Sequence, residues 1–256
     1  MSNAGQRYFI QLSYDGTAYH GWQIQENTFS TVQQVLNEML SRLLNEPIFI
    51  TGCGRTDTGV HAKQYYAHFD CTKNLKEEED KWIFKFNHAL PADIAIQKII
   101  RVTAKANARF DATSRTYEYH IHRKKNPFLV NRSHFMYFDL NVDKMNEAAK
   151  LLFDYIDFSS FAKSNTQNFT NNCKIYKAEW SVKEELLVFT ISADRFLRNM
   201  VRAIVGTLIN VGKGKISLEE FKTIIEEKNR SSAGLSVPAC GLYLTNITYP
   251  LNYLNE

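Results

Sequence analysis

The order in which strand-like and helix-like apolar patterns follow one another limits the folds open to this chain. Aromatic and branched residues at Tyr8–Tyr14 predict a strand. From Val32 to Leu44 the apolar residues recur at helical spacing, which predicts an amphipathic helix. Ser30 and Gln33 form a capping-box pattern at the start of this helix, and Pro47 marks its end.

Four more segments continue this pattern in the first half of the chain. Branched and alternating apolar residues predict strands at 48–53, 64–70 and 94–102. Between the last two strands a helix is expected through Trp82, Phe86 and His88, and Pro91 closes it. The order of strand, helix, strand, strand, helix, strand is that of a ferredoxin-like unit.

The second half repeats this order less regularly. It predicts strands at 116–122, 134–138, 174–182, 186–193 and 242–248, and helices at 142–153 and 196–211. Ser217 with Glu220 caps one further helix. We therefore expect an α+β protein of two pseudo-duplicated, ferredoxin-like (RRM-like) halves, residues 7–107 and 108–256, with a joined, mainly antiparallel sheet and flanking helices.

Size and composition exclude several classes of protein. At 256 residues the chain can bury enough apolar surface to fold without disulfides. Its four cysteines are scattered singly, without the paired spacing of a zinc site, and we expect a reducing cytoplasm. No apolar run approaches the roughly 20 residues that span a bilayer. The net charge of +4 does not by itself establish a nucleic-acid partner, but it leaves room for a local basic patch.

A glycine-punctuated loop between the second and third predicted strands carries the most chemistry. Three glycines in the segment 52–59 permit tight turns and close approach of the backbone to a ligand. Arg55, Asp57 and His61 are the ionisable residues of this loop and its edge. No second ligand at metal spacing accompanies His61, so we interpret it as a structural or loop-orienting residue and expect no metal.

The segment 54–61, Gly-Arg-Thr-Asp-Thr-Gly-Val-His, resembles the signature Gly-Arg-Thr-Asp-Ala-Gly-Val-His of the tRNA pseudouridine synthase A family. It departs from that signature only at Thr58. Further resemblance lies in Tyr14-Asp15-Gly16, Gly21-Trp22-Gln23, Asn87–Ala95, Ala108-Arg109-Phe110, Tyr117-Glu118-Tyr119 and Phe196–Arg202. The resemblance therefore extends from Tyr8 to Pro250.

This resemblance implies an isomerase that converts uridine to pseudouridine in the anticodon arm of tRNA, at positions 38 to 40. It implies a homodimer that shares each tRNA, and it calls for no cofactor. Asp57 would be the catalytic carboxylate, because an aspartate beside the sugar or base can add covalently or abstract a proton. Whether it attacks the ribose, attacks the base or deprotonates the ribose stays open.

The resemblance also assigns roles to three other residues. Arg202 would pair with Asp57 and keep its carboxylate ionised. Tyr117 would stack on the extruded uracil, and Arg55 would fill the gap left by the flipped nucleotide and touch phosphate. Unstacking a base costs a few kcal/mol, which an aromatic face and a guanidinium can offset.

Two further features are candidates for RNA contact. Arg195, Arg198 and Arg202 are spaced by three and four residues, so on a helix they would share one basic side. The polar segment Lys163–Asn172 is either a lid that faces the substrate or a solvent-exposed loop with no role in binding, and the sequence leaves both interpretations open.

Asp57-Thr58-Gly59 also spells the catalytic triplet of aspartic proteases, in which two carboxylates share a proton. We reject this interpretation because the sequence contains no second triplet, and because a nearby arginine favours charged carboxylates. The other alternative is a non-catalytic RNA-binding module, since ferredoxin-like sheets that display aromatic residues bind single-stranded RNA. Such a module would not need Asp57.

Overall fold

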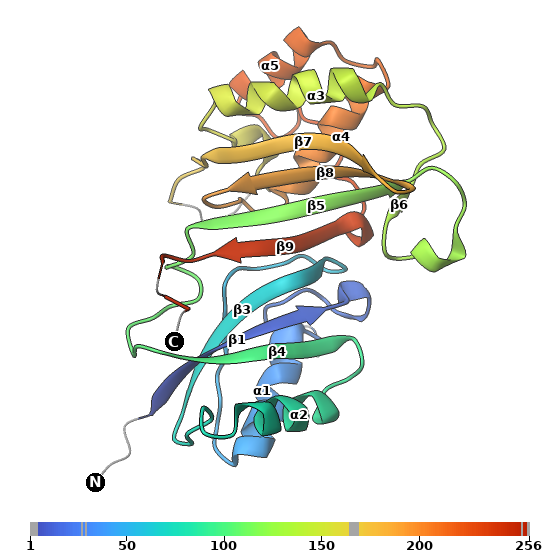
Figure 1. Cartoon of the computed structure of the whole chain (residues 1–256). Helices are drawn as coiled ribbons and strands as arrows, with labels where there is room; N and C mark the ends of the chain where they lie inside the picture. The colour runs from blue at the N-terminus through green and yellow to red at the C-terminus, as the bar shows by residue number, and fades with distance from the viewer. Residues whose placement is uncertain (1–4, 27, 29, 164–168, 252, 255–256) are drawn as a thin grey trace. The chain divides into compact units, whose positions relative to one another are not determined.

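Strand β1 (Gln6–Tyr14) is the middle strand of the first repeat in a computed structural model that describes residues 5–26, 28, 30–163, 169–251 and 253–254. It pairs antiparallel with β3 (His61–Cys71) on one side and with β4 (Ile94–Val102) on the other. The short strand β2 (Thr51–Gly52) pairs with β3. Helices α1 (Val32–Leu44) and α2 (Glu79–Ala89) complete the expected ferredoxin-like order (Figure 1).

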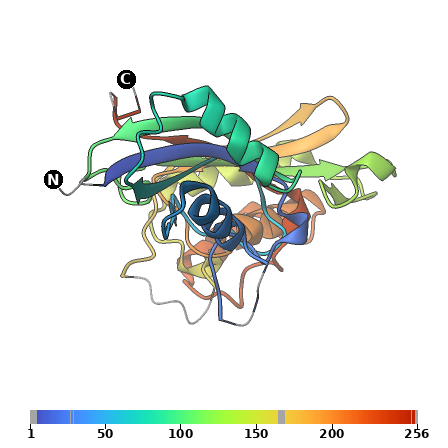
Figure 2. The same cartoon turned by 90° about the horizontal axis from the view of Figure 1, so that it is seen from below.

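Helix α1, drawn in blue in Figure 2, has one face of buried apolar side chains that contributes to the core of this repeat. The buried residues on that face are Val32, Leu36, Met39, Leu40 and Leu44. The predicted capping box at Ser30 and Gln33 is wrong. The cap is Thr31, which accepts the backbone N–H of Gln34, while the Ser30 hydroxyl donates to the Ala18 carbonyl.

The strand expected at 48–53 is reduced to the two residues of β2 because side chains of α1 occupy its backbone groups. The Ile48 amide donates to the Ser41 hydroxyl at 2.8 Å, and the Ile50 amide donates to the Asn37 side chain at 2.9 Å. The Ile50 carbonyl in turn accepts from the Gln33 side chain. These groups are satisfied without a strand partner.

The second repeat follows the same order. It consists of β5 (Ser114–His122), α3 (Val142–Leu151), β7 (Ile175–Lys183), β8 (Leu186–Ala193), α4 (Met200–Gly212), α5 (Leu218–Glu226) and β9 (Leu242–Thr248), with a two-residue strand β6 (His134–Phe135) beside β5. Short 3-10 helices lie at Gly16–Ala18, Pro127–Leu129, Leu152–Asp154, Ser159–Phe161 and Ala239–Gly241. The capping box predicted at Ser217 and Glu220 is confirmed.

The predicted fold class is confirmed. The strands follow the hydrogen-bonded order β4-β1-β3-β9-β5-β8-β7, so each repeat sets its last strand beside its first and its first beside its third. By its internal contacts the chain divides into two compact units, Met1–Thr113 with Leu244–Glu256, and Ser114–Tyr243. Strand β9 crosses this boundary, since Leu242 and Tyr243 belong to the second unit. None of the described helices is long and apolar enough to cross a membrane.

Helix α4 starts later than predicted. It begins at Met200 rather than at residue 196, because Asn199 has a left-handed backbone conformation with φ 67°. Arg195 and Arg198 therefore precede the helix, and only Arg202 lies on it. The expected basic side of a single helix does not form.

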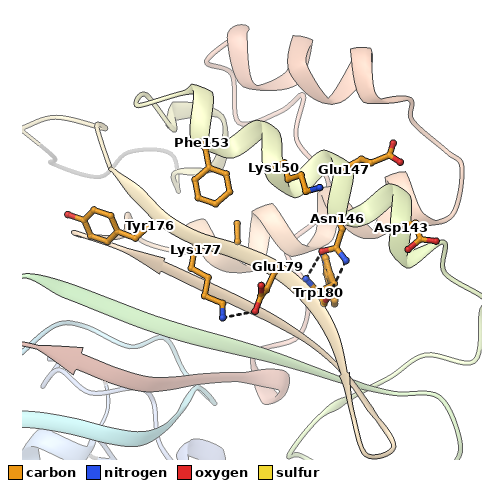
Figure 3. Close-up of a pocket in the computed structure, with 10 residues that line it drawn as sticks. Asp143, Asn146, Glu147, Lys150, Phe153, Tyr176, Lys177, Glu179 and Trp180 are labelled. Carbon is orange, nitrogen blue, oxygen red and sulfur yellow. Dashed lines mark hydrogen bonds and ion pairs between the residues drawn. The ribbon is translucent and has the colours of Figure 1, made fainter.

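Strand β7 ends the strand order and is fastened by a side chain of α3. The Asn146 carboxamide accepts the backbone N–H of Trp180 at 2.7 Å and donates to its carbonyl at 3.1 Å (Figure 3). These two bonds satisfy one residue of a strand edge that would otherwise be open to another chain.

The surroundings of His68, His122 and His134 disfavour the protonated ring, which should make folding depend on pH. His68 lies in β3, 6% exposed, and its Nδ1 accepts the Ala108 backbone N–H at 3.1 Å. Burial lowers the pKa of His68, and the positive charge of Arg7 lowers it further. Burial lowers the pKa of His122 and of His134 as well.

We predict that the melting temperature falls as the pH is lowered from about 7.5 to about 5.5. The unfolded chain takes up protons on these histidines at a higher pH than the folded chain does, so acid favours unfolding. Thermal unfolding followed by circular dichroism measures the slope. His68→Gln keeps an acceptor for the Ala108 amide but does not titrate, so it should flatten the slope. An unchanged slope in this variant would exclude His68 as a source.

Candidate active site

The loop that carries Asp57 is held from beneath by two phenol hydroxyls. The Tyr65 hydroxyl donates to the Gly54 carbonyl, and the Tyr14 hydroxyl lies 2.9 Å from the Thr56 hydroxyl. The residues that follow these two positions, Arg55 and Asp57, are exposed and partly exposed respectively. Asp57 is therefore not sealed in an apolar interior.

The segment that follows β1 runs close against this loop. The Trp22 amide donates to the Thr56 carbonyl at 3.3 Å, and the Gly59 amide donates to the Tyr19 carbonyl at 3.3 Å. At Gly21, which has φ +82°, a Cβ atom would lie 2.3 Å from the Thr56 carbonyl oxygen. Only glycine permits that approach and that backbone conformation together.

Three aromatic side chains form the floor under the loop. Trp22 and Tyr65 stack with ring centroids 4.1 Å apart, and Tyr14 meets Tyr65 edge to face at 5.7 Å. All three are at most 4% exposed. Such pairs have a preferred geometry, so the ring positions, and with them the hydroxyl positions, are tightly set.

His61 fixes the end of the loop to the turn after β1. It is 2% exposed, and its Nδ1 lies 3.0 Å from the Gly16 backbone nitrogen, whose N–H it accepts. Asp15 lies 3.1 Å from the same nitrogen. This arrangement suits the loop-orienting role that we infer for His61. Among the residues that the structure describes, no group of three His, Cys, Asp or Glu side chains could hold a metal ion.

Arg55 and Thr58 flank the central part of the loop on its outer side. The Arg55 Nε donates to the Gln23 side chain at 2.5 Å, so this exposed guanidinium has a defined direction. Thr58, which differs from the family signature, is exposed beside Asp57. Its side chain has room at this position, and the loop accommodates it without burial.

The other predicted residues belong to the second unit. Tyr117 lies in the middle of β5, partly buried, and its ring meets Phe196 edge to face at 5.2 Å. Arg202 lies in the first turn of α4, where its Nε donates to the Val237 carbonyl at 2.8 Å. The Val237 amide donates back to the Arg202 carbonyl at 3.2 Å.

The segment that holds Arg202, residues 234–237, has no signature in the sequence that predicts this contact. It passes so close to α4 that a Cβ atom on Gly206 would lie 1.9 Å from the Leu235 carbonyl oxygen. The Gly234 amide also donates to the Thr207 hydroxyl at 2.9 Å. Glycines at both points of contact are the only signal in the sequence, and glycine alone does not reveal which segment approaches.

Arg195 and Arg198 contact the ends of the segment predicted as a lid. The Arg195 guanidinium donates to the Thr170 carbonyl at 3.3 Å, and the Lys163 amide donates to the Arg198 carbonyl at 3.0 Å. The Arg198 side chain is exposed. The central part of the predicted lid, 164–168, lies outside the described residues.

A groove of about 770 Å³ lies between α3 and β7 (Figure 3). It is lined by side chains of both charges, including the ion pair of Lys177 with Glu179 at 2.6 Å, and by the aromatic rings of Phe153 and Tyr176. None of the predicted site residues lies in it.

Comparison with known proteins agrees with the motif. A family model described as tRNA pseudouridine synthase matches residues 11–111 and 148–250. A tRNA pseudouridine synthase A of Bacteroides fragilis is 52% identical over 96% of this chain and 97% of its own length, and that of Parabacteroides distasonis is 50% identical over 96% of each. The protein of the same name from Neisseria meningitidis is 37% identical over 97% of this chain and 94% of its own length. The chain therefore belongs to the tRNA pseudouridine synthase family.

Proposed function

We propose that this enzyme isomerises uridine to pseudouridine in the anticodon arm of tRNA, at positions 38 to 40, with Asp57 as the catalytic carboxylate. The observation that carries the proposal is the partly exposed Asp57 in a loop held by Tyr14 and Tyr65, within a member of this family. A carboxylate held in one place and open on one side is what an attack on a nucleoside requires.

The reaction breaks the bond between C1′ of the ribose and N1 of the uracil, and forms a bond between C1′ and C5. The hydrogen on C5 leaves as a proton, and N1 gains one, so the product is an isomer of the substrate. Because nothing is oxidised and no group is imported, the proposal includes neither a cofactor nor a metal. Asp57 acts either as the nucleophile or as the base.

Three residues support this chemistry in the proposal. Tyr117 stacks on the extruded uracil, Arg55 takes the place of the flipped nucleotide and contacts phosphate, and Arg202 keeps the Asp57 carboxylate ionised. Stacking contributes about 1–3 kcal/mol per base, comparable to the few kcal/mol that unstacking costs. Arg195 and Arg198 are proposed to contact the RNA backbone. A homodimer working in the cytoplasm completes the proposal, and it rests on family resemblance.

Asp57→Asn should lower tritium release from tRNA labelled at C5 of uridine by about 10²–10⁴-fold, with tRNA affinity retained. The amide keeps the shape of the side chain but loses its charge. Single-turnover release and filter binding measure the two effects. Asp80→Asn, an exposed aspartate on α2, is the control and should be fully active. Normal turnover by Asp57→Asn would remove Asp57 from catalysis, and a wild-type protein that binds tRNA without turnover would be an RNA-binding module.

Tyr117→Ala should slow single-turnover release by about 10–100-fold, because the stacking surface for the base is lost. Tyr117→Phe keeps that surface, so it should retain the stacking contribution and reveal what the hydroxyl adds. Far-UV circular dichroism checks that both variants are folded. If Tyr117→Ala reacts at the wild-type rate, Tyr117 does not touch the base.

Arg198→Gln should weaken tRNA binding and reduce the slope of log affinity against log salt by about one, since one phosphate contact is lost. Arg198 is chosen because its side chain is exposed, and Arg195 is not used because Arg195→Gln would break the bond to Thr170. Lys150→Gln, an exposed residue of α3, is the matched charge control. A salt slope equal to that of the wild type would show that Arg198 does not contact phosphate.

A further inference from the structure

We propose that Tyr14 is a positioning residue for catalysis, which sets the direction of the Asp57 carboxylate through the side chain of Thr56. This inference rests on the proposed function, since it concerns the carboxylate assigned to catalysis there. The two hydroxyl oxygens, of Tyr14 and Thr56, lie 2.9 Å apart, within hydrogen-bond distance. Thr56 directly precedes Asp57, so a rotation of Thr56 about its backbone moves the carboxylate.

The phenol of Tyr14 is suited to this role because its own position is set by packing. Tyr14 is 4% exposed, and the centroid of its ring lies 5.7 Å from that of Tyr65 and 6.3 Å from that of Trp22. Tyr14 is also the last residue of β1, the middle strand of the first repeat. Because the strand and the neighbouring rings fix the position of the Tyr14 ring, they also fix the position of its hydroxyl beside Thr56.

Thr56 is held on its backbone side as well. Its carbonyl accepts the Trp22 N–H at 3.3 Å, and Gly21 passes close enough to exclude any side chain there. Two residues earlier, the Tyr65 hydroxyl donates to the Gly54 carbonyl. Residues 54 and 56 are thus bound to the core, while Arg55 is exposed and Asp57 is partly exposed.

The hydroxyl pair can be broken from either side, which makes the inference testable by a double-mutant cycle. Tyr14→Phe removes one hydroxyl and keeps the ring. Thr56→Val removes the other and keeps the branched shape. If the two hydroxyls act only through each other, the double variant is no slower than the slower single variant, because the second change has nothing left to remove.

Each single variant should lower the single-turnover rate of tritium release by about 10–100-fold, as expected when a reacting group is displaced by a fraction of an ångström to an ångström. The affinity for tRNA should stay at the wild-type value, because neither hydroxyl is proposed to contact RNA. Thr56→Ser, which keeps a hydroxyl, should restore most of the rate. A residue that only stabilises the fold would not produce this separation of rate from affinity.

Tyr8→Phe is the matched control for loss of a buried phenol hydroxyl. Tyr8 lies in the same strand, fully buried, and its hydroxyl accepts the Leu75 amide at 3.1 Å, away from the Asp57 loop. It should lower the melting temperature at least as much as Tyr14→Phe does, with the single-turnover rate unchanged.

Three outcomes would overturn the positioning role. They are a wild-type rate in Tyr14→Phe, fully additive losses in the double variant, or an equal loss of rate in Tyr8→Phe. Each is read against Asp57→Asn in the same assay. If Asp57→Asn is inactive, any of these outcomes rejects the role of Tyr14 alone. If Asp57→Asn is active, the proposed catalytic role of Asp57 fails, and the positioning role fails with it.

Discussion

The contact between the turn after β1 and the loop of residues 54–60 is the constraint on which the first unit depends. Two glycines, at 16 and 21, let backbone meet backbone there: a Cβ atom on Gly16 would lie 2.0 Å from the Val60 carbonyl oxygen, and one on Gly21 2.3 Å from that of Thr56. The aromatic floor beneath converts this contact into a defined loop shape. The loop can then keep one conformation although Asp57 is partly exposed.

In the second unit, packing of a backbone segment on helix α4 fixes the position of Arg202. Helix α4 is buried on nearly every side, and the irregular segment from Gly234 to Val237 packs on it through the close contact at Gly206. Arg202 and Asn210 are the two residues of this helix that are only partly buried, and Arg202 is bonded to Val237. In both units the backbone at or beside a residue with a proposed role is therefore hydrogen-bonded to a neighbouring segment, which limits its motion.

Much of the fold could be predicted because the spacing of apolar residues and the residue types at turns and helix caps act on the local backbone. The bounds expected for β4, β8 and β9 agree with the structure residue for residue, and so does the capping box of α5. The failures have non-local causes. The side chains of Asn37 and Ser41 accept hydrogen bonds from backbone amides of the expected second strand. The left-handed conformation of Asn199 makes α4 begin later in the sequence than predicted. No periodicity in the sequence reports either event.

The sequence by itself determined the repeated α+β order, the family and the identity of the loop with Asp57, because each depends on residue types at fixed spacing. Only the tertiary structure decided what holds that loop. Tyr14, Gly21 and Tyr65 lie far from Asp57 along the chain or on other elements, and their contacts with residues 54 and 56 exist only once β1 and β3 are paired. Hydrogen bonds and close packing act at distances of a few ångströms, so they are set by the folded backbone and leave no trace in sequence spacing.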